Sequence, residues 1–351
     1  MGANKFSSSE QSAIFAVSTT FSVFSMVGAS LIIFSYYKFP NLRKFSFKLV
    51  LFMSITDGMG CISYLIGNPT DQSGLCTFQG FMQQLFQLSS ILWTTAISTT
   101  LYRAVVKRMG SKELMMRYHL ICSGVPTLFA LLPLTTSSYG NTAAWCWIYV
   151  EEDSPTIGQL WRFFLFYLPL WGAVVFNGYT YYISNRAMKG LFLSNDDQQI
   201  PKKYRNLMRR LNAYPLILAG CWFFATINRI QNAINPQNPL FWLYMLQVVG
   251  RSLQGTLNAI AYGLNENVRA EWASYLHIRF PNSSLAAWYV EKANDSMRMK
   301  EMDVAATNGG DSEYEGGDRE SDSEDEPSPY DSPMAEEPDP AGSISAARRS
   351  I

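Results

Sequence analysis

Ionisable side chains in the middle of long apolar segments are the residues of this sequence best suited to chemistry. Asp57 lies midway along the apolar segment 47–67, and Arg251 lies midway along 240–263. Charges in hydrocarbon are costly, so they are functional candidates by default. Two interpretations stay open. Arg251 forms the floor of a pocket for an anionic ligand, with Arg162 and Arg229 nearby, or it pairs with Asp57 while the other two arginines reach the membrane interface.

A row of polar side chains, here called the polar stripe, follows the segment 76–106. At about 100° per residue its members fall within one helical face about 100° wide. Unsatisfied amides and hydroxyls are costly in hydrocarbon, so this face points to other helices or to a wet cavity. We favour a ligand cavity above Gln87 and interhelical hydrogen bonds below it. The stripe consists of Gln79, Gln83, Gln87, Ser90, Thr94 and Ser98.

The residue sets that membrane enzymes and retinal proteins require are not found in this sequence. A retinal protein needs a lysine in its last span, but there is no Lys from 204 to 291. A metallohydrolase needs clustered ligands, whereas the chain has only two histidines, His119 and His277. An intramembrane protease needs paired aspartates, and only Asp57 is deeply placed. We therefore expect no enzyme, no metal and no cofactor.

The formal net charge of zero is the sum of a basic piece and an acidic piece of the chain. Residues 1–280 contain 22 Lys and Arg against 11 Asp and Glu, and residues 281–351 contain 6 against 17. The acidic piece is poor in large apolar residues, which predicts disorder. Seven apolar segments of membrane-spanning length precede it. They are 12–38, 47–67, 76–106, 118–139, 160–188, 211–234 and 240–263.

The connections between these segments alternate between basic loops and acidic or neutral loops. The positive-inside rule puts the basic loops in the cytoplasm and the N-terminal residues 1–11 outside. The sequence thus predicts an all-α fold with a seven-transmembrane helix bundle over 12–264, in the plasma membrane. A short amphipathic interfacial helix follows over 265–280, and a disordered acidic cytoplasmic tail over 281–351.

Cysteine positions predict one disulfide. Cys76 at the outer end of the third span and Cys146 in the next outer loop are the two cysteines near the oxidising side, so we expect them to be bonded. The bond ties the loop over the third span. The remaining cysteines, Cys61, Cys122 and Cys221, lie within spans and are expected to be packing residues.

Four serines in the acidic tail are candidate phosphorylation sites. Ser321 and Ser323 lie in an acidic cluster, whereas Ser328 and Ser332 each precede a proline. These contexts suit acid-directed and proline-directed kinases. Added phosphate charge would dock the tail onto a basic adaptor protein or onto the basic loops. The alternative is a solubilising tail without a switch.

Motifs in the last two spans carry a family resemblance. Asn258 and Tyr262 are spaced as in the Asn-Pro-x-x-Tyr motif of G-protein-coupled receptors, with Ala259 in the proline's place. Residues 214–222 and 226–229 of the sixth span, and the outer loop 145–148, resemble the slime-mould cyclic-AMP-receptor-like family with its fungal and plant relatives. The resemblance covers about residues 12–280.

The resemblance implies roles for individual residues. Asp57 and Asn258 resemble the pair that forms a water- or sodium-linked network, and Trp222 resembles the toggle tryptophan of the sixth span. Arg103 resembles the arginine that engages the G protein, although no acid precedes it. Phe224 replaces the proline usual after the tryptophan, so a kink must come from elsewhere.

The sequence therefore predicts a receptor that couples a small extracellular ligand to a heterotrimeric G protein. Cyclic AMP is a ligand hypothesis that rests on the resemblance and on the three arginines. An alternative is a seven-span transporter or channel with a polar path along the third helix, and another is a scaffold whose tail recruits partners. Membrane lipids are expected partners, and nucleic acids are not.

Overall fold

The computed structural model describes residues 6–71, 73–142, 145–150, 155–193, 213–235, 238–263 and 266–280. Several predictions fall outside these ranges and stay predictions. They are the phosphorylation sites Ser321, Ser323, Ser328 and Ser332, the acidic tail, and the basic residues at 202–210.

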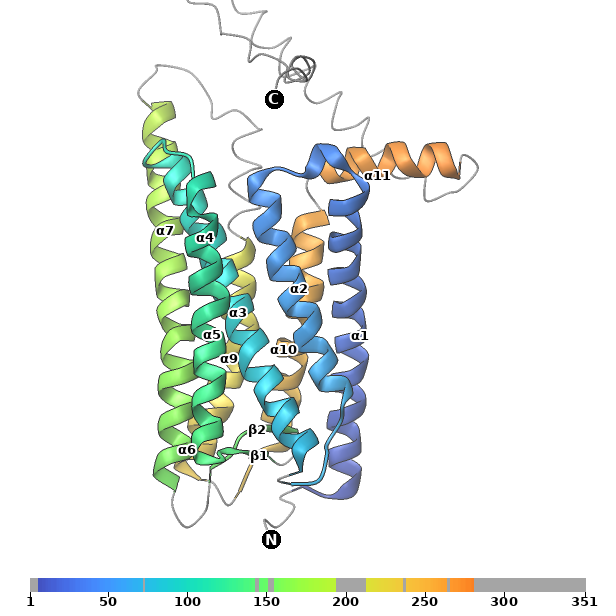
Figure 1. The fold of residues 1–351 in the computed structure, drawn as a ribbon, viewed down its shortest axis with the longest axis vertical. Helices are drawn as coiled ribbons and strands as arrows, with labels where there is room; N and C mark the ends of the chain where they lie inside the picture. The colour runs from blue at the N-terminus through green and yellow to red at the C-terminus, as the bar shows by residue number, and fades with distance from the viewer. Residues whose placement is uncertain are drawn as a thin grey trace, which may run out of the picture. The chain divides into compact units, whose positions relative to one another are not determined.

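Long helices make up most of the described chain, and they lie side by side (Figure 1). α1 neighbours α2 and α10, α10 also neighbours α9, and α3 packs against α2, α5 and α7. Short 3₁₀ and π turns, labelled η, break some of them. The helices are α1 (Ser8–Lys38), α2 (Phe45–Leu65), α3 (Gly74–Val105), α4 (Met115–His119), α5 (Val125–Leu131), α6 (Pro155–Arg162), α7 (Leu168–Leu193), α9 (Ala213–Ile234), α10 (Phe241–Gly263) and α11 (Glu266–Arg279).

Four helical stretches are long and apolar enough to cross a membrane, namely 8–38, 45–65, 112–136 and 157–189. These agree with four of the seven predicted spans. The other three predicted spans correspond to α3, α9 and α10, which carry buried polar side chains such as Gln83, Asn228 and Gln254. Such side chains lower the mean hydropathy of a helix without exposing it to lipid. These three spans stay predictions.

Side chains of α3 donate hydrogen bonds to backbone carbonyl groups at an irregular turn in each of two neighbouring helical segments. A π turn, η3 (Leu120–Gly124), joins α4 to α5, and a second one, η5 (Phe163–Tyr167), joins α6 to α7. A π turn leaves backbone groups without their usual helical partners. The Ser89 hydroxyl donates to the carbonyl oxygen of Cys122 at 2.5 Å, and the Gln84 amide donates to that of Leu165 at 3.0 Å.

A small hairpin packs on the beginning of α3. Its strands β1 (Tyr139–Asn141) and β2 (Cys146–Ile148) pair antiparallel, with Asn141 opposite Cys146. The predicted disulfide is present: Cys146 is bonded to Cys76 at the beginning of α3, with 5.2 Å between the Cα atoms. The bond fixes β2 against the end of the helix that carries the polar stripe.

α1 and α10 approach closely through small residues. A Cβ atom on Gly28 would lie 2.8 Å from Cβ of Ala259, so only glycine fits there. Ser25 on α1 donates a hydrogen bond to the backbone oxygen of Ser252 and accepts one from the backbone of Thr256 at 2.9 Å. The two helices are therefore held together by close packing of small residues and by hydrogen bonds between the Ser25 side chain and the backbone of α10.

α11 packs against the end of α1. The Trp272 indole donates to the Ser35 hydroxyl at 2.9 Å, and Val268 and Leu276 are buried. Val268, Trp272 and Leu276 are spaced by four residues and so lie along one side of this helix, as expected of the predicted amphipathic helix. Its predicted place in the inner membrane interface stays a prediction.

Candidate functional site

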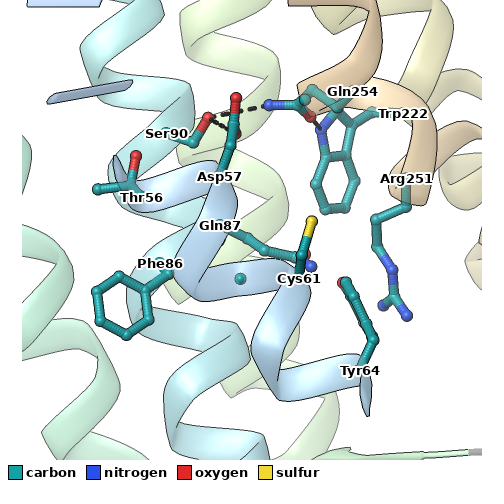
Figure 2. A pocket seen from close by; sticks show the side chains of 12 residues that line it. Thr56, Asp57, Cys61, Tyr64, Phe86, Gln87, Ser90, Trp222, Arg251 and Gln254 are labelled. Carbon is teal, nitrogen blue, oxygen red and sulfur yellow. Dashed lines mark hydrogen bonds between the residues drawn. The ribbon is translucent and has the colours of Figure 1, made fainter. Parts of the chain in front are cut away.

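A narrow cavity lies where α2, α3, α9 and α10 meet, and Figure 2 shows the side chains around it. It has room for about one or two water molecules. Its lining mixes acidic, basic, amide and aromatic groups. It consists of Thr56, Asp57, Gly60, Cys61, Tyr64, Phe86, Gln87, Ser90, Trp222, Arg251, Gln254 and Gly255.

A continuous chain of hydrogen bonds, here called the polar chain, runs along this cavity through four helices. The Trp222 indole donates to the side-chain oxygen of Gln254 at 2.8 Å. The Gln254 amide donates to the Ser90 hydroxyl at 3.0 Å, and Ser90 donates to the Asp57 carboxylate at 2.5 Å. The Asn258 amide donates to the other Asp57 oxygen at 2.9 Å. The polar chain thus joins Trp222 of α9 to Asn258 of α10 through α3 and α2.

Asp57 and Arg251 have different partners. Asp57 binds Ser90 and Asn258, whereas the Arg251 guanidinium lies 4.2 Å from the ring centroid of Tyr64 and 4.3 Å from that of Trp145. Figure 2 shows the Arg251 side chain directed away from Asp57. The internal ion pair considered from the sequence is therefore not formed, because neutral donors already satisfy the carboxylate.

Arg162, Arg229 and Arg251 gather around the aromatic side chains of the hairpin; we call them the three-arginine cluster. Arg229 lies over Trp145, Trp147 and Tyr244, with 5.6–5.9 Å from its guanidinium carbon to the ring centroids. Arg162 lies over Trp147 at 5.6 Å and donates to the backbone oxygen of Ile148 at 2.7 Å. Arg162 and Arg229 thus share the Trp147 ring, and Arg229 and Arg251 share the Trp145 ring.

Several nitrogen donors of this cluster are buried without a hydrogen-bond acceptor in the part of the chain that the structure describes. They are Nε and Nη2 of Arg229 and Nε and Nη2 of Arg251, and the indole nitrogen of the adjoining Trp145 is unpaired in the same way. Within the same residues no carboxylate forms an ion pair with Arg251, which is 7% exposed. The acidic residues 151–153 lie outside the described ranges. Buried cationic donors without acceptors are costly, and an anion that supplies oxygen atoms would remove that cost.

The glutamines of the polar stripe have unlike surroundings. Gln79, which the sequence puts among the ligand-binding residues, donates to the backbone oxygens of Ser63 and Gly67 and accepts from the backbone of Cys146 at 2.8 Å. Its amide therefore holds the hairpin against α3, and ligand binding by Gln79 stays a prediction. Gln87 lines the narrow cavity, and Gln83 is buried with neither amide atom paired in the described residues.

Gln84 has a structural role that the polar stripe does not predict. Its amide donates to Leu165 in the π turn before α7 and accepts from the Trp147 indole at 3.1 Å. Gln84 therefore links the hairpin under the three-arginine cluster to the helix that carries Arg162. Gln84 lies about 100° around the helix from Gln83 and so falls outside the polar stripe, and no other feature of the sequence distinguishes the two glutamines.

Replacing Gln84 by leucine is expected to lower the free energy of unfolding by about 1–3 kcal/mol, because Trp147 and Leu165 each lose a buried hydrogen bond. Thermal unfolding of the purified protein in detergent measures this change. Gln83→Leu is the matched control: it makes the same replacement at an equally buried neighbour whose amide has no partner in the described ranges. The control should leave stability unchanged or raise it. Equal destabilisation by the two variants would contradict the role of Gln84.

The inner end of α3 carries Arg103. Its guanidinium donates to the backbone oxygen of Gly110 at 3.0 Å, and Lys107 and Arg108 beside it are exposed. Tyr262 at the end of α10 is buried and packs edge-on against Phe47, with 4.5 Å between the ring centroids. Arg103 is thus held by the loop that follows its own helix.

Comparison with known proteins gives a consistent result. A family profile described as slime mold cyclic AMP receptor matches residues 5–288. The chain is 34% identical over 279 residues to G-protein coupled receptor 1 of Arabidopsis thaliana, covering 78% of this chain and 84% of that protein. It is 32% identical over 250 residues to cyclic AMP receptor-like protein A of Dictyostelium discoideum, covering 70% and 62%. It is 25% identical over 264 residues to G-protein coupled receptor 157 of Homo sapiens, covering 68% and 77%.

Proposed function

The chain belongs to the slime mold cyclic AMP receptor family, and from this premise we propose that it transmits an extracellular small-molecule signal to a heterotrimeric G protein. The family is one of receptors, and several helices of this chain are long and apolar enough to cross a membrane. The proposed topology has seven spans in the plasma membrane, with the N-terminus outside and the acidic tail inside. The alternation of basic and acidic loops supports it.

The ligand that we propose is a small anion bound by the three-arginine cluster, and cyclic AMP is the specific hypothesis. The observation that carries the proposal is Arg251, which is buried between Tyr64 and Trp145 with unpaired donors within the described chain. Gln83 and Gln87 would contact the same ligand: Gln87 lines the narrow cavity with Arg251, and Gln83 lies about one turn earlier on α3, buried with an unpaired amide in the described residues. The hairpin with Trp145 and Trp147 would then cover the bound ligand.

Transmission would follow the polar chain. Arg251 and Trp222 line the same narrow cavity, and the polar chain connects Trp222 to Asp57 and Asn258. A ligand that favours one packing of α9 against α10 shifts the population toward that packing. An outward movement of the inner end of α9 would expose a basic surface to the G protein. That surface comprises Arg103, Lys107, Arg108, Lys202, Lys203, Arg209 and Arg210.

Tail phosphorylation would end the signal. Phosphates on Ser321, Ser323, Ser328 and Ser332 would add negative charge to an acidic segment that can dock onto an arrestin-like adaptor. Removal of residues 295–351 should then leave coupling intact and slow desensitisation. A scaffold would instead lose all function.

Guanine-nucleotide exchange on a panel of Gα subunits tests the proposal, with the purified full-length chain in nanodiscs, with and without cyclic nucleotides. Arg103→Ala should lower the exchange rate roughly 30-fold, the loss of about 2 kcal/mol at an arginine hot spot. Arg117→Ala is the matched control, since it removes the same charge from an exposed position on the same side. If no Gα, including the native one, responds to well-folded protein, coupling is excluded. Solute flux that is sensitive to Gln83→Ala would then favour the transporter.

A further inference from the structure

The loop that follows α3, here called the cap loop (residues 106–111), folds back onto the end of its own helix. The backbone N–H of Met109 donates to the carbonyl oxygen of Arg103 at 3.0 Å. A bond across this number of residues is typical of a Schellman motif at a helix C-terminus. One residue later, the carbonyl oxygen of Gly110 accepts from the Arg103 guanidinium at 3.0 Å. The cap loop therefore binds Arg103 twice, once through its backbone and once through its side chain.

Arg108 occupies the left-handed position of this motif, with a φ angle of 53°. Glycine is usual there, because a left-handed backbone costs free energy for any residue that has a Cβ atom. The closed cap loop forms in spite of this cost. Its closed form is therefore only weakly favoured, and a change at one backbone angle is enough to open it.

Both ends of the cap loop are fixed by packing that does not involve Arg108. The hydroxyl groups of Thr100 on α3 and Tyr118 on α4 are hydrogen-bonded at 3.1 Å, and both side chains are buried. Ser111, at the end of the loop, is 5% exposed. An opening of the cap loop is thus confined to 106–110 and leaves α4 in place beside α3.

Closure of the cap loop withholds the Arg103 side chain from the surface. Arg103 is partly buried and its Nε atom is fully buried, whereas Lys107 and Arg108 are exposed. Within the described residues Arg103 forms no ion pair with a carboxylate, and the backbone oxygen of Gly110 is its acceptor. Hydrogen bonds of a charged donor are stronger than those of a neutral one. A protein that binds Arg103 must therefore first displace the cap loop.

We propose that the cap loop is an autoinhibitory element that, when closed, keeps Arg103 from the G protein. The backbone preference of residue 108 sets the fraction of molecules in which the loop is open, and this fraction sets the basal activity. The inference rests on the proposed function, since it takes Arg103 as a contact of the G protein. It adds a regulatory role for Arg108 that depends on its φ angle and not on its charge.

Three replacements of Arg108 separate the φ angle from the charge, because glycine, alanine and proline all remove the guanidinium. Glycine adopts the left-handed conformation freely, alanine keeps its cost, and proline fixes φ near −65° and prevents closure. Basal nucleotide exchange on the native Gα is measured with the full-length protein in nanodiscs, without ligand. Arg108→Gly should exchange roughly fivefold more slowly than Arg108→Ala, and Arg108→Pro should exchange faster than Arg108→Ala.

Ser137→Gly is the matched control for the relief of backbone strain. Within the described chain Ser137 is the other non-glycine residue with a positive φ angle, 49°, and it lies in the turn before the hairpin. The replacement relieves the same kind of strain far along the chain from Arg103. It should leave basal exchange unchanged.

Hydrogen–deuterium exchange of residues 106–111, followed by mass spectrometry, measures opening of the cap loop without any G protein. The Met109 N–H is protected only while it is bonded to Arg103. Relative to Arg108→Ala, deuterium uptake should be slower in Arg108→Gly and faster in Arg108→Pro. If the proline variant does not fold, the comparison of glycine with alanine decides.

Several results would overturn the proposal. Equal deuterium uptake in the glycine and alanine variants would make the cap loop an ordinary helix end. Ordered uptake with equal nucleotide exchange would show that the loop closes without inhibiting, and fastest nucleotide exchange in Arg108→Gly would show that the G protein binds the closed loop. Ordered uptake without nucleotide exchange on any Gα would remove the proposed coupling itself, so the two failures are distinguishable.

Discussion

Replacing Arg251 by methionine is expected to abolish saturable binding of the anionic ligand and, at the same time, to make the ligand-free protein more resistant to heat. Arg251 is buried between two aromatic rings, and within the described residues it has no carboxylate partner. A bound anion would pair with this charge away from water. Removing one partner of a buried charge pair costs about 2–5 kcal/mol, which lowers affinity roughly 30- to several-thousand-fold.

The thermal stability of the ligand-free protein should rise in this variant, because the uncompensated buried charge of Arg251 destabilises the wild-type protein. Methionine keeps the length and apolar contacts of the side chain and removes the cost of burying the guanidinium. Binding of tritiated cyclic AMP to membranes with verified surface expression measures the first effect. Thermal unfolding without ligand measures the second effect.

Arg162→Met is the control for this pair of measurements. Arg162 is less buried than Arg251 and already donates to the backbone of Ile148, so its removal should reduce binding less and should not stabilise the protein. Unchanged binding in Arg251→Met would contradict the anion site. A loss of binding together with a loss of stability would make Arg251 a structural residue.

Gln254→Leu is expected to separate ligand binding from G-protein activation. Gln254 is the link between Trp222 and Ser90 in the polar chain, and leucine cannot replace either hydrogen bond. Ligand affinity should stay within a few-fold, since Gln254 is not part of the three-arginine cluster. The ratio of ligand-stimulated to basal exchange should fall toward one, a loss of coupling of about 1–3 kcal/mol.

The matched control for Gln254→Leu is Gln247→Leu. Gln247 is two turns earlier on α10, equally buried, and hydrogen-bonded to Asn228 at 2.5 Å outside the polar chain. Its loss should lower stability without lowering the exchange ratio. Equal uncoupling by both variants would show that any buried defect in α10 impairs activation, and the polar chain would then have no special role.

Much of the architecture can be predicted from sequence because it depends on local patterns. Hydropathy marks the apolar helices, and the positions of Cys76 and Cys146 near one membrane face predict their bond. The family motif relates Asp57 to Asn258, and the structure brings the two side chains into contact. The helices follow from local composition, whereas the disulfide follows from membrane topology and the Asp57–Asn258 contact from the family resemblance.

The roles of individual glutamines on α3 could not be predicted in the same way. Gln79, Gln83 and Gln84 are identical in type and lie within six residues of one another, but Gln79 holds the hairpin and Gln84 donates to a carbonyl group of a π turn. These roles depend on the neighbours that the fold brings to each position. The same holds for Trp145 and Trp147, whose rings meet the arginines from a short loop without periodicity.

The two π turns have a mechanical consequence. Each contains one extra residue, so the helix on one side is rotated by about 100° relative to an uninterrupted helix. If a π turn moved along its helix, the segment that it crossed would rotate about its own axis, while both ends of the helix stayed in place. The hydrogen bonds from Ser89 and Gln84 hold the two π turns at their present positions. If the hydrogen bond from Gln84 to Leu165 broke, the π turn between α6 and α7 could shift, and Arg162 would rotate about the helix axis without a sideways movement of either helix.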